Sequence, residues 1–366
     1  MAEAMLAVGT RKGLLLFERQ KGQKGLWRLI RESHVGVPVP YAAADPRSGV
    51  LWASLDHGHW GQKLQRSTNL GVDWQELPAP KYPEDAVLKE GKPATLRYLW
   101  VIGFGGADQR GRIYFGTEPG GLFVSDDGGE SCRLVDSLWN HPSRIGHWLG
   151  GGRDEAGIHS IVVDPRDSKH VLIGVSCAGV FETFDDCASW EPRNKGLIAP
   201  FLPDPSVDVG HDPHLLVGCA AAPDVLWQQN HCGIFRSSDG ARSWQAVHEQ
   251  AGPANFGFAI AVDAAHPDCA WVVPAASDEV RVAVDRALCV CRTDDGGRTW
   301  QAFREGLPQH NCYDFAFRHA LDVNADQLAF GTATGSLYHS DNHGESWQCL
   351  GDHLPPIYSV RFVPAG

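Results

Sequence analysis

Five histidines are the residues of this chain whose type and placement most clearly suggest chemistry. A neutral imidazole is a good ligand for Zn, Mn, Fe or Ni, and its pKa near neutrality also suits acid–base catalysis. Several of these side chains could converge on one divalent metal ion, which would act as a Lewis acid on a carboxylate or carbonyl group. The expected metal ligands are His57, His59, His159, His214 and His231.

The run Trp227-Gln-Gln-Asn-His-Cys-Gly surrounds one of these histidines with amides. A turn between strands does not need three amides and an imidazole in succession, so we expect this loop to make polar contacts to a ligand. Gln228 could also add an amide oxygen to the metal site. The expected substrate-binding residues, here and in other loops, are Arg11, Lys12, Arg97, Tyr98, Gln228, Gln229, Asn230, Glu279 and Arg281.

Three interpretations of these residues stay open. In the first, a metal works with an acid or base drawn from Glu118, Tyr313 and Lys12. In the second, imidazoles, arginines and carboxylates bind a small anionic molecule without metal. A glycosidase of this kind needs two carboxylates about 5–10 Å apart, with Asp56, Glu118 and Glu279 as candidates. In the third, the chain is a binding module that recognises a peptide or partner surface. The expected catalytic residues are His231, Glu118 and Tyr313.

Six copies of the pattern Ser/Thr-x-Asp-x-Gly-x-x-Trp, the Asp box, indicate the elements that position these residues. Asp accepts hydrogen bonds from its own turn, Gly supplies a positive φ, and Trp packs between neighbouring sheets. The copy at 293–300 is complete, and each other copy has one of these three residues replaced. A repeat of this period is typical of a propeller or solenoid, so each box is predicted to fasten a hairpin. The copies begin at Ser67, Ser125, Thr183, Ser237, Thr293 and Ser340.

Each repeat contains short strands rich in β-branched and aromatic residues and separated by turns. One unit comprises 158–165, 171–175, 179–183 and 190–193, and the last comprises 313–317, 328–332 and 336–339. Four strands per unit make a propeller blade. Residues 5–17 match only the second and third strands of a blade, and the missing first strand is found at 357–363. We therefore predict an all-β, seven-bladed β-propeller, a single domain over 1–366, closed by the C-terminal strand joining the N-terminal blade.

The composition limits which partners the chain can bind and in which cellular compartment we expect it. The formal net charge of −12 argues against nucleic acid, whose binders carry a basic face. No apolar run approaches the roughly 20 residues that span a bilayer, and the N-terminus lacks the features of a secretory signal. Ten irregularly spaced cysteines are typical of a reduced, cytoplasmic protein. We expect no nucleotide cofactor, and no sequence feature requires an oligomer.

The boxes and their spacing resemble the Asp-box (BNR) repeat families, which include sialidases, sortilin-type receptor propellers and bacterial sialidase-like proteins. The resemblance covers nearly the whole chain and implies the propeller fold. A sialidase would also need three arginines on the substrate carboxylate, a Tyr–Glu nucleophile pair and an Asp acid. The chain has no Arg-Ile-Pro motif, and its N-terminal blade offers only Arg11 and Lys12.

These observations lead to one main hypothesis. The chain is predicted to be an intracellular hydrolase or lyase that acts on a small polar or sugar-like substrate. Its site would lie in the central channel, on the face opposite the boxes, and one divalent metal would assist it. The alternatives are a non-catalytic binding propeller and a sialidase-like glycoside hydrolase without metal.

Overall fold

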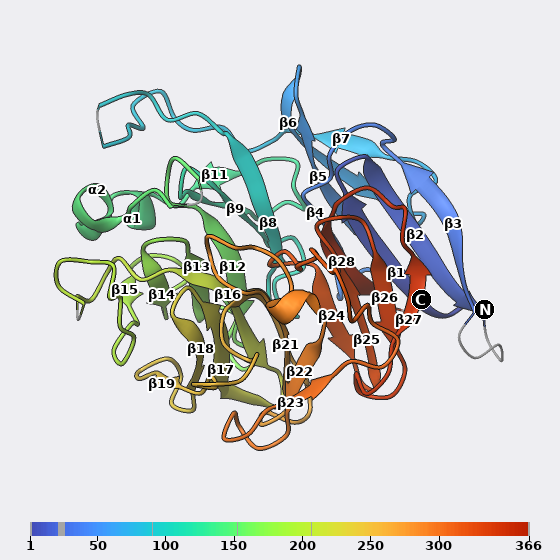
Figure 1. Cartoon of the computed structure of the whole chain (residues 1–366). Coiled ribbons are helices and arrows are strands. Elements are labelled where there is room, and N and C mark those ends of the chain that lie inside the picture. Colours follow the sequence, from blue (N-terminus) through green and yellow to red (C-terminus); the bar gives the residue numbers. More distant parts are fainter. Residues whose placement is uncertain (1, 21–25, 90, 152, 206, 365–366) are drawn as a thin grey trace.

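Seven sheets of four antiparallel strands form a ring in the computed structural model, which describes residues 2–20, 26–89, 91–151, 153–205 and 207–364 (Figure 1). Each sheet is one blade, and its first strand lies nearest the centre of the ring. The predicted seven-bladed all-β propeller is confirmed.

Blade 1 combines the two ends of the chain, in the order β28 (Ile357–Val363), β1 (Ala2–Thr10), β2 (Gly13–Gln20) and β3 (Trp27–Ser33). Blades 2 and 3 comprise β4 (Tyr41–Ala44), β5 (Leu51–His57), β6 (Gly61–Ser67), β7 (Gln75–Leu77), then β8 (Tyr98–Phe104), β9 (Ile113–Glu118), β10 (Leu122–Ser125) and β11 (Arg133–Leu134). Blade 4 comprises β12 (Ile158–Val163), β13 (Val171–Val175), β14 (Gly179–Thr183) and β15 (Glu191–Pro192).

Blade 5 comprises β16 (Pro213–Cys219), β17 (Ala222–Asn230), β18 (Gly233–Ser237) and β19 (Gln245–Ala246). Blades 6 and 7 comprise β20 (Gly257–Val262), β21 (Ala270–Pro274), β22 (Val290–Thr293), β23 (Gln301–Phe303), then β24 (Leu321–Asn324), β25 (Gln327–Gly331), β26 (Leu337–Ser340) and β27 (Gln348–Gly351). The helical segments are α1 (Asp136–Trp139), α2 (Ser143–His147) and the 3-10 turn η1 (Val284–Arg286). None of the helices in the described ranges is long and apolar enough to cross a membrane.

The Asp boxes lie at the turns between the third and fourth strands and make the same hydrogen bonds six times. The Asp or Asn side chain accepts from the backbone N–H four residues later, at 2.8–3.1 Å. The Ser or Thr hydroxyl accepts from the N–H of the fifth position, at 2.8–3.2 Å. The fifth position has a positive φ in every copy, including Cys187 and Ala241, where Gly is replaced. The boxes thus fix the hairpins between third and fourth strands. The loops at the opposite ends of the blades are not part of this repeated pattern and can differ from blade to blade.

The last strand closes the ring. Strand β28 pairs antiparallel with β1, with Met5 opposite Val363 and Val8 opposite Val360. Figure 1 shows these two ends of the chain side by side. Buried Leu6, Val8 and Val360 then form one apolar cluster with the neighbouring blade 7. The predicted closure by the C-terminal strand is confirmed.

Two local predictions are wrong. Residues 313–317 were expected to be the first strand of blade 7, but that strand is β24, and the carbonyl of Phe315 accepts from the N–H of Ala333 instead of joining a sheet. Residues Gln228, Gln229 and Asn230 were expected in a loop, but they lie in β17, paired with β16 and β18. At 313–317 alternating aromatic residues resemble a strand where there is none, and at 228–230 three consecutive amides hide the alternation that identifies a strand.

Candidate functional site

A cavity of about 860 Å³ lies at the centre of the ring. All seven blades contribute to it, through their first strands, the segments before these strands, and the ends and turns of their second and third strands. We call it the hub cavity. Its lining includes Arg11, Tyr358, Asp56, Tyr98, Trp100, Arg153, Ser176, Cys177, Asp212, His214, His231, Phe258, Asp278, Arg281, Phe317, Arg318 and His319.

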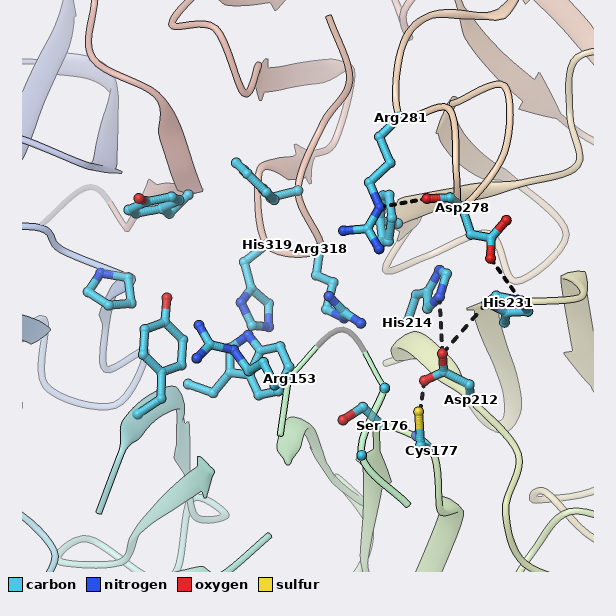
Figure 2. Close-up of a pocket in the computed structure, with 18 of the residues that line it drawn as sticks. Arg153, Ser176, Cys177, Asp212, His214, His231, Asp278, Arg281, Arg318 and His319 are labelled. Atoms are coloured by element: carbon cyan, nitrogen blue, oxygen red, sulfur yellow. Dashed lines mark hydrogen bonds and ion pairs between the residues drawn. The ribbon is translucent and has the colours of Figure 1, made fainter. Parts of the chain in front are cut away.

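Four arginines give the hub cavity a basic character. Figure 2 shows the guanidinium groups of Arg153, Arg281 and Arg318 directed toward the same space, and Arg11 also lines the cavity. Guanidinium groups bind carboxylates and phosphates through paired hydrogen bonds. The cavity is therefore suited to an anionic group.

Arg153 is tied to blade 3. Its Nη1 donates to Glu118 Oε2 at 2.8 Å, and its guanidinium carbon lies 3.7 Å from the centre of the Tyr98 ring. Burial raises the pKa of Tyr98, so its hydroxyl is protonated at neutral pH. Arg153 thus presents a fixed positive charge beside a phenol.

Arg318 is held between the rings of Trp100 and Phe258, whose centres lie 5.0 and 5.5 Å from its guanidinium carbon. Its Nε is buried and has no hydrogen-bond partner in the described part of the chain. Burial lowers the pKa of Arg318, and the nearby charge of Asp212 opposes this effect. A bound anion would supply the hydrogen-bond acceptors that this guanidinium lacks.

Beside Arg281 and Arg318, one carboxylate faces two imidazoles (Figure 2). Asp212 Oδ2 lies 3.5 Å from His214 Nε2 and 3.8 Å from His231 Nδ1, and Asp278 Oδ2 lies 3.6 Å from His231 Nε2. The backbone N–H of Cys177 donates to Asp212 Oδ1 at 3.0 Å, and His214 Nδ1 lies 2.6 Å from the carbonyl oxygen of Gly257. Figure 2 shows this cluster beside Arg281 and Arg318.

The protonation of the cluster follows from burial and charge. Burial alone would raise the pKa of Asp212, but His214, Arg318 and the Cys177 amide together lower it, so the carboxylate is ionised. Burial lowers the pKa of His214, although Asp212 opposes the shift. At neutral pH the cluster therefore combines an anionic carboxylate with a neutral His214, a set that can bind a cation or transfer a proton.

Comparisons with solved structures show the fold. An ancestral GH74 enzyme matches with a TM-score of 0.60 at 17% identity, over 86% of this chain and 38% of that enzyme. YCF48 bound to D1 peptide matches with a TM-score of 0.53 at 13% identity, over 86% and 82% of the two chains. YCF48 from Cyanidioschyzon merolae matches with a TM-score of 0.52 at 15% identity, over 91% of this chain and 88% of that one.

The chain is similar in fold to these seven-bladed propellers. It spans well under half the length of the GH74 enzyme, and all three identities are too low to transfer a function. No family model matches the chain, and neither does any curated protein sequence.

The hub cavity brings together six of the residues predicted from the sequence. Two of the expected metal ligands lie in one cluster, and three expected substrate-binding residues and one candidate carboxylate line the same cavity. These residues are His214, His231, Arg11, Tyr98, Arg281 and Asp56.

The other three expected metal ligands lie elsewhere. His57 ends β5, and its Nδ1 accepts from the backbone N–H of Trp60 at 3.1 Å, while His59 is exposed and packs against the Trp60 ring. His159 is fully buried behind the cavity lining, with Nδ1 2.8 Å from Ser160 Oγ. Within the described ranges, the group of three potential ligands that lie close together is Asp212, His214 and His231. The structure therefore does not bring His57, His59 and His159 to that group.

The three amides of β17 are buried in the blade and do not line the hub cavity. Asn230 Nδ2 donates to Gln228 Oε1 at 2.9 Å, and Gln229 Nε2 donates to the carbonyl of Asn255 at 2.9 Å. These bonds hold the end of β17, from which His231 projects into the cavity. The amides thus position His231 in this structure.

The remaining expected residues also lie outside the cavity lining. Glu118 is buried, and its carboxylate accepts from the cavity-lining Arg153. Exposed Arg97 forms an ion pair with Asp154 at 3.4 Å. The others are exposed on the surface, namely Lys12, Glu279 and Tyr313, the last with 62% of its surface accessible.

Three central residues were missed. Asp212 stands two positions before His214, a spacing that puts both side chains on one face of an extended segment, so the sequence did carry a signal for it. Arg153 and Arg318 follow irregular segments whose course the repeat pattern does not define. Their convergence depends on ring closure and is visible only in the structure.

Proposed function

We propose that this chain is a hydrolase or lyase acting, in the hub cavity, on a small polar or sugar-like substrate that carries an anionic group. The observation that supports this most directly is that Arg153, Arg281 and Arg318 line the same cavity as the Asp212–His214–His231 cluster, with Arg281 and Arg318 beside that cluster (Figure 2). The first set binds and orients an anion, and the second exchanges protons with the substrate.

Each residue has a role in this proposal. Arg318 and Arg281 hold the anionic group against the Trp100 and Phe258 rings, which exclude water from one face of the substrate. His231 is the acid–base residue, because its ring is partly exposed to the cavity and flanked by Asp212 and Asp278. Membership of the Asp-box propellers is part of the same proposal, supported by six hairpins that make the same hydrogen bonds.

The first experiment is a thermal-shift screen of small anions, comprising uronates, sialate, sugar phosphates and dicarboxylates, with neutral sugars alongside. A ligand at about 100 times its Kd adds about 2.7 kcal/mol of stability, a clear rise in Tm. We expect anions to raise the Tm of the wild type and of Arg97→Gln, whose arginine is exposed outside the cavity. Arg318→Gln should weaken binding about 10- to 100-fold.

Turnover is then measured on glycosides and esters of the anions that bind. His231→Gln should retain binding and lose turnover about 10²–10⁴-fold. If neutral sugars bind as well as anions, and Arg318→Gln binds unchanged, the assignment of the anion site is wrong. Tight binding with no turnover of any derivative would instead identify a binding module.

A sialidase-like hydrolase without metal is a second candidate, favoured by one observation. Four arginines line the cavity, one more than a sialidase needs, and Tyr98 lies opposite Glu118 across the β8–β9 pair, with Arg153 contacting both. An aryl sialoside tests this candidate directly. Release of the aryl group that Tyr98→Phe abolishes and His231→Gln leaves unchanged would favour it over the main proposal.

A further inference from the structure

The Asp212–His214–His231 cluster has an unusual arrangement of hydrogen-bond acceptors. His214 Nδ1 lies 2.6 Å from the carbonyl oxygen of Gly257, which can only accept, so Nδ1 carries the proton. The other nitrogen of the neutral ring, Nε2, then has a lone pair and faces the carboxylate Oδ2 of Asp212 at 3.5 Å. Two acceptors thus face each other without a proton between them.

His231 repeats this arrangement from the other side. Its Nε2 faces Asp278 Oδ2 at 3.6 Å, and its Nδ1 faces Asp212 Oδ2 at 3.8 Å. In the tautomer with its proton on Nε2, which the negative charge of Asp278 favours, Nδ1 is a third acceptor directed at the same point. A carbonyl that fixes the tautomer of an inner histidine, as Gly257 does for His214, is usual in the second layer of a metal site.

The distances also favour a shared cation over direct hydrogen bonds. The two nitrogen–oxygen separations, 3.5 and 3.8 Å, exceed the 2.7–3.2 Å of a normal hydrogen bond. Two ligands on one tetrahedral ion with bonds of about 2.1 Å lie about 3.4 Å apart. The ligand atoms of the three residues all lie within 4.8 Å of one another.

We propose that Asp212, His214 and His231 bind one divalent transition-metal ion of the Zn²⁺ or Fe²⁺ class, with its remaining coordination positions open to the hub cavity. Two histidines and one carboxylate with open positions are a set used by catalytic metals. This inference rests on the proposed function and changes one role in it: a substrate held on Arg281 and Arg318 would lie beside the metal, and His231 would act on it through the metal and not by proton transfer. The metal could then polarise a carbonyl or activate a water molecule.

The test measures metal binding and does not depend on activity. The full chain, without a His tag, is stripped with a chelator, dialysed, and titrated with Zn²⁺ and with Co²⁺, whose absorption spectrum reports coordination by nitrogen and oxygen. We expect one equivalent to bind, with a matching rise in Tm. Elemental analysis by plasma mass spectrometry gives the stoichiometry.

Substitutions then locate the site. His231→Gln, at a partly exposed position, should weaken Co²⁺ binding by more than 100-fold, and Asp212→Ala should do the same. Asp278→Asn, which alters only the outer partner, should weaken binding about 10- to 100-fold. His57→Gln and His59→Gln are matched controls and should bind as the wild type does.

Two results would overturn the inference. One is a chelator-treated wild type that takes up less than about a tenth of an equivalent of either ion. The other is a folded His231→Gln variant, checked by circular dichroism, that binds as tightly as the wild type. Metal binding without any turnover would contradict the proposed function and leave the metal site intact. Turnover that the chelator leaves unchanged would contradict the metal site and leave the proposed function intact.

Discussion

At the scale of single residues, His170 shows how this acidic chain stabilises buried charge. Its Nδ1 lies 2.8 Å from Asp164 Oδ2 and its Nε2 lies 2.7 Å from Glu182 Oε1, with all three side chains largely buried. Burial alone would lower the pKa of His170, but Glu182 and Asp164 outweigh it and raise the pKa above 6.5. A raised pKa in the folded state stabilises the fold below the unfolded value, and this contribution is lost as pH rises through the folded value.

We predict that His170→Gln destabilises the protein by about 2 kcal/mol at pH 6 and by about 1 kcal/mol less at pH 8.5, because hydrogen bonds to charged groups are the stronger ones. Urea unfolding at both pH values measures the difference. His266→Gln is the control, since His266 is 77% exposed beside Asp263 and should change stability by less than about 0.5 kcal/mol. A deficit that grows with pH would contradict the sign of the argument.

Some residues of the site could be predicted from the sequence, and others could not. His214 and His231 were predicted because imidazoles at turns facing the channel are unusual, and Asp212 could have been added from its spacing to His214. Arg318 could not have been found in the same way. Its neighbours, Trp100 and Phe258, come from two other blades, and no local pattern in the sequence encodes that contact.

At the scale of elements, the hairpins carry their own stabilisation. In the complete box, Asp295 Oδ1 accepts from the Thr299 N–H at 2.9 Å, and Oδ2 accepts from the Thr299 hydroxyl at 2.7 Å. We predict that Asp295→Ala costs about 1–2 kcal/mol, because the Thr299 N–H loses its partner. Asp295→Asn should cost less than half as much, since Asn69 and Asn342 make the same backbone bond. Equal losses in thermal or urea unfolding would contradict this account of the box.

The strands were predicted well where characteristic turn residues mark their ends in the sequence. Strands β13 and β14 match the expected 171–175 and 179–183 to the residue, because Asp-Pro and Asp-box turns bound them. The segment 313–317 failed because its alternating aromatic residues resemble a strand, whereas Phe315 and Phe317 pack with other rings at the centre of the ring. A tertiary contact outweighed the local preference there.

At the scale of the whole molecule, the closing strand makes the seven blades one structure. Strand β28 contacts β1 within its own sheet, β4 on one side, and β24 and β25 on the other. An open array of repeats depends only on contacts between neighbours and can lose its end units singly. A closed ring has no end units, so opening one junction removes a restraint that all blades share.

We therefore predict that Val360→Asp destabilises the entire ring. Val360 is fully buried against Leu6 and Val8, so an unpaired carboxylate there should cost about 3–5 kcal/mol. Hydrogen exchange should show protection lost by the same amount in β13, in blade 4, as in β1. Val35→Asp places the same charge at a position 72% exposed and should leave protection unchanged. If Val360→Asp loosens only blades 1, 2 and 7, the blades are independent, and the hub cavity could open at one junction without unfolding the rest.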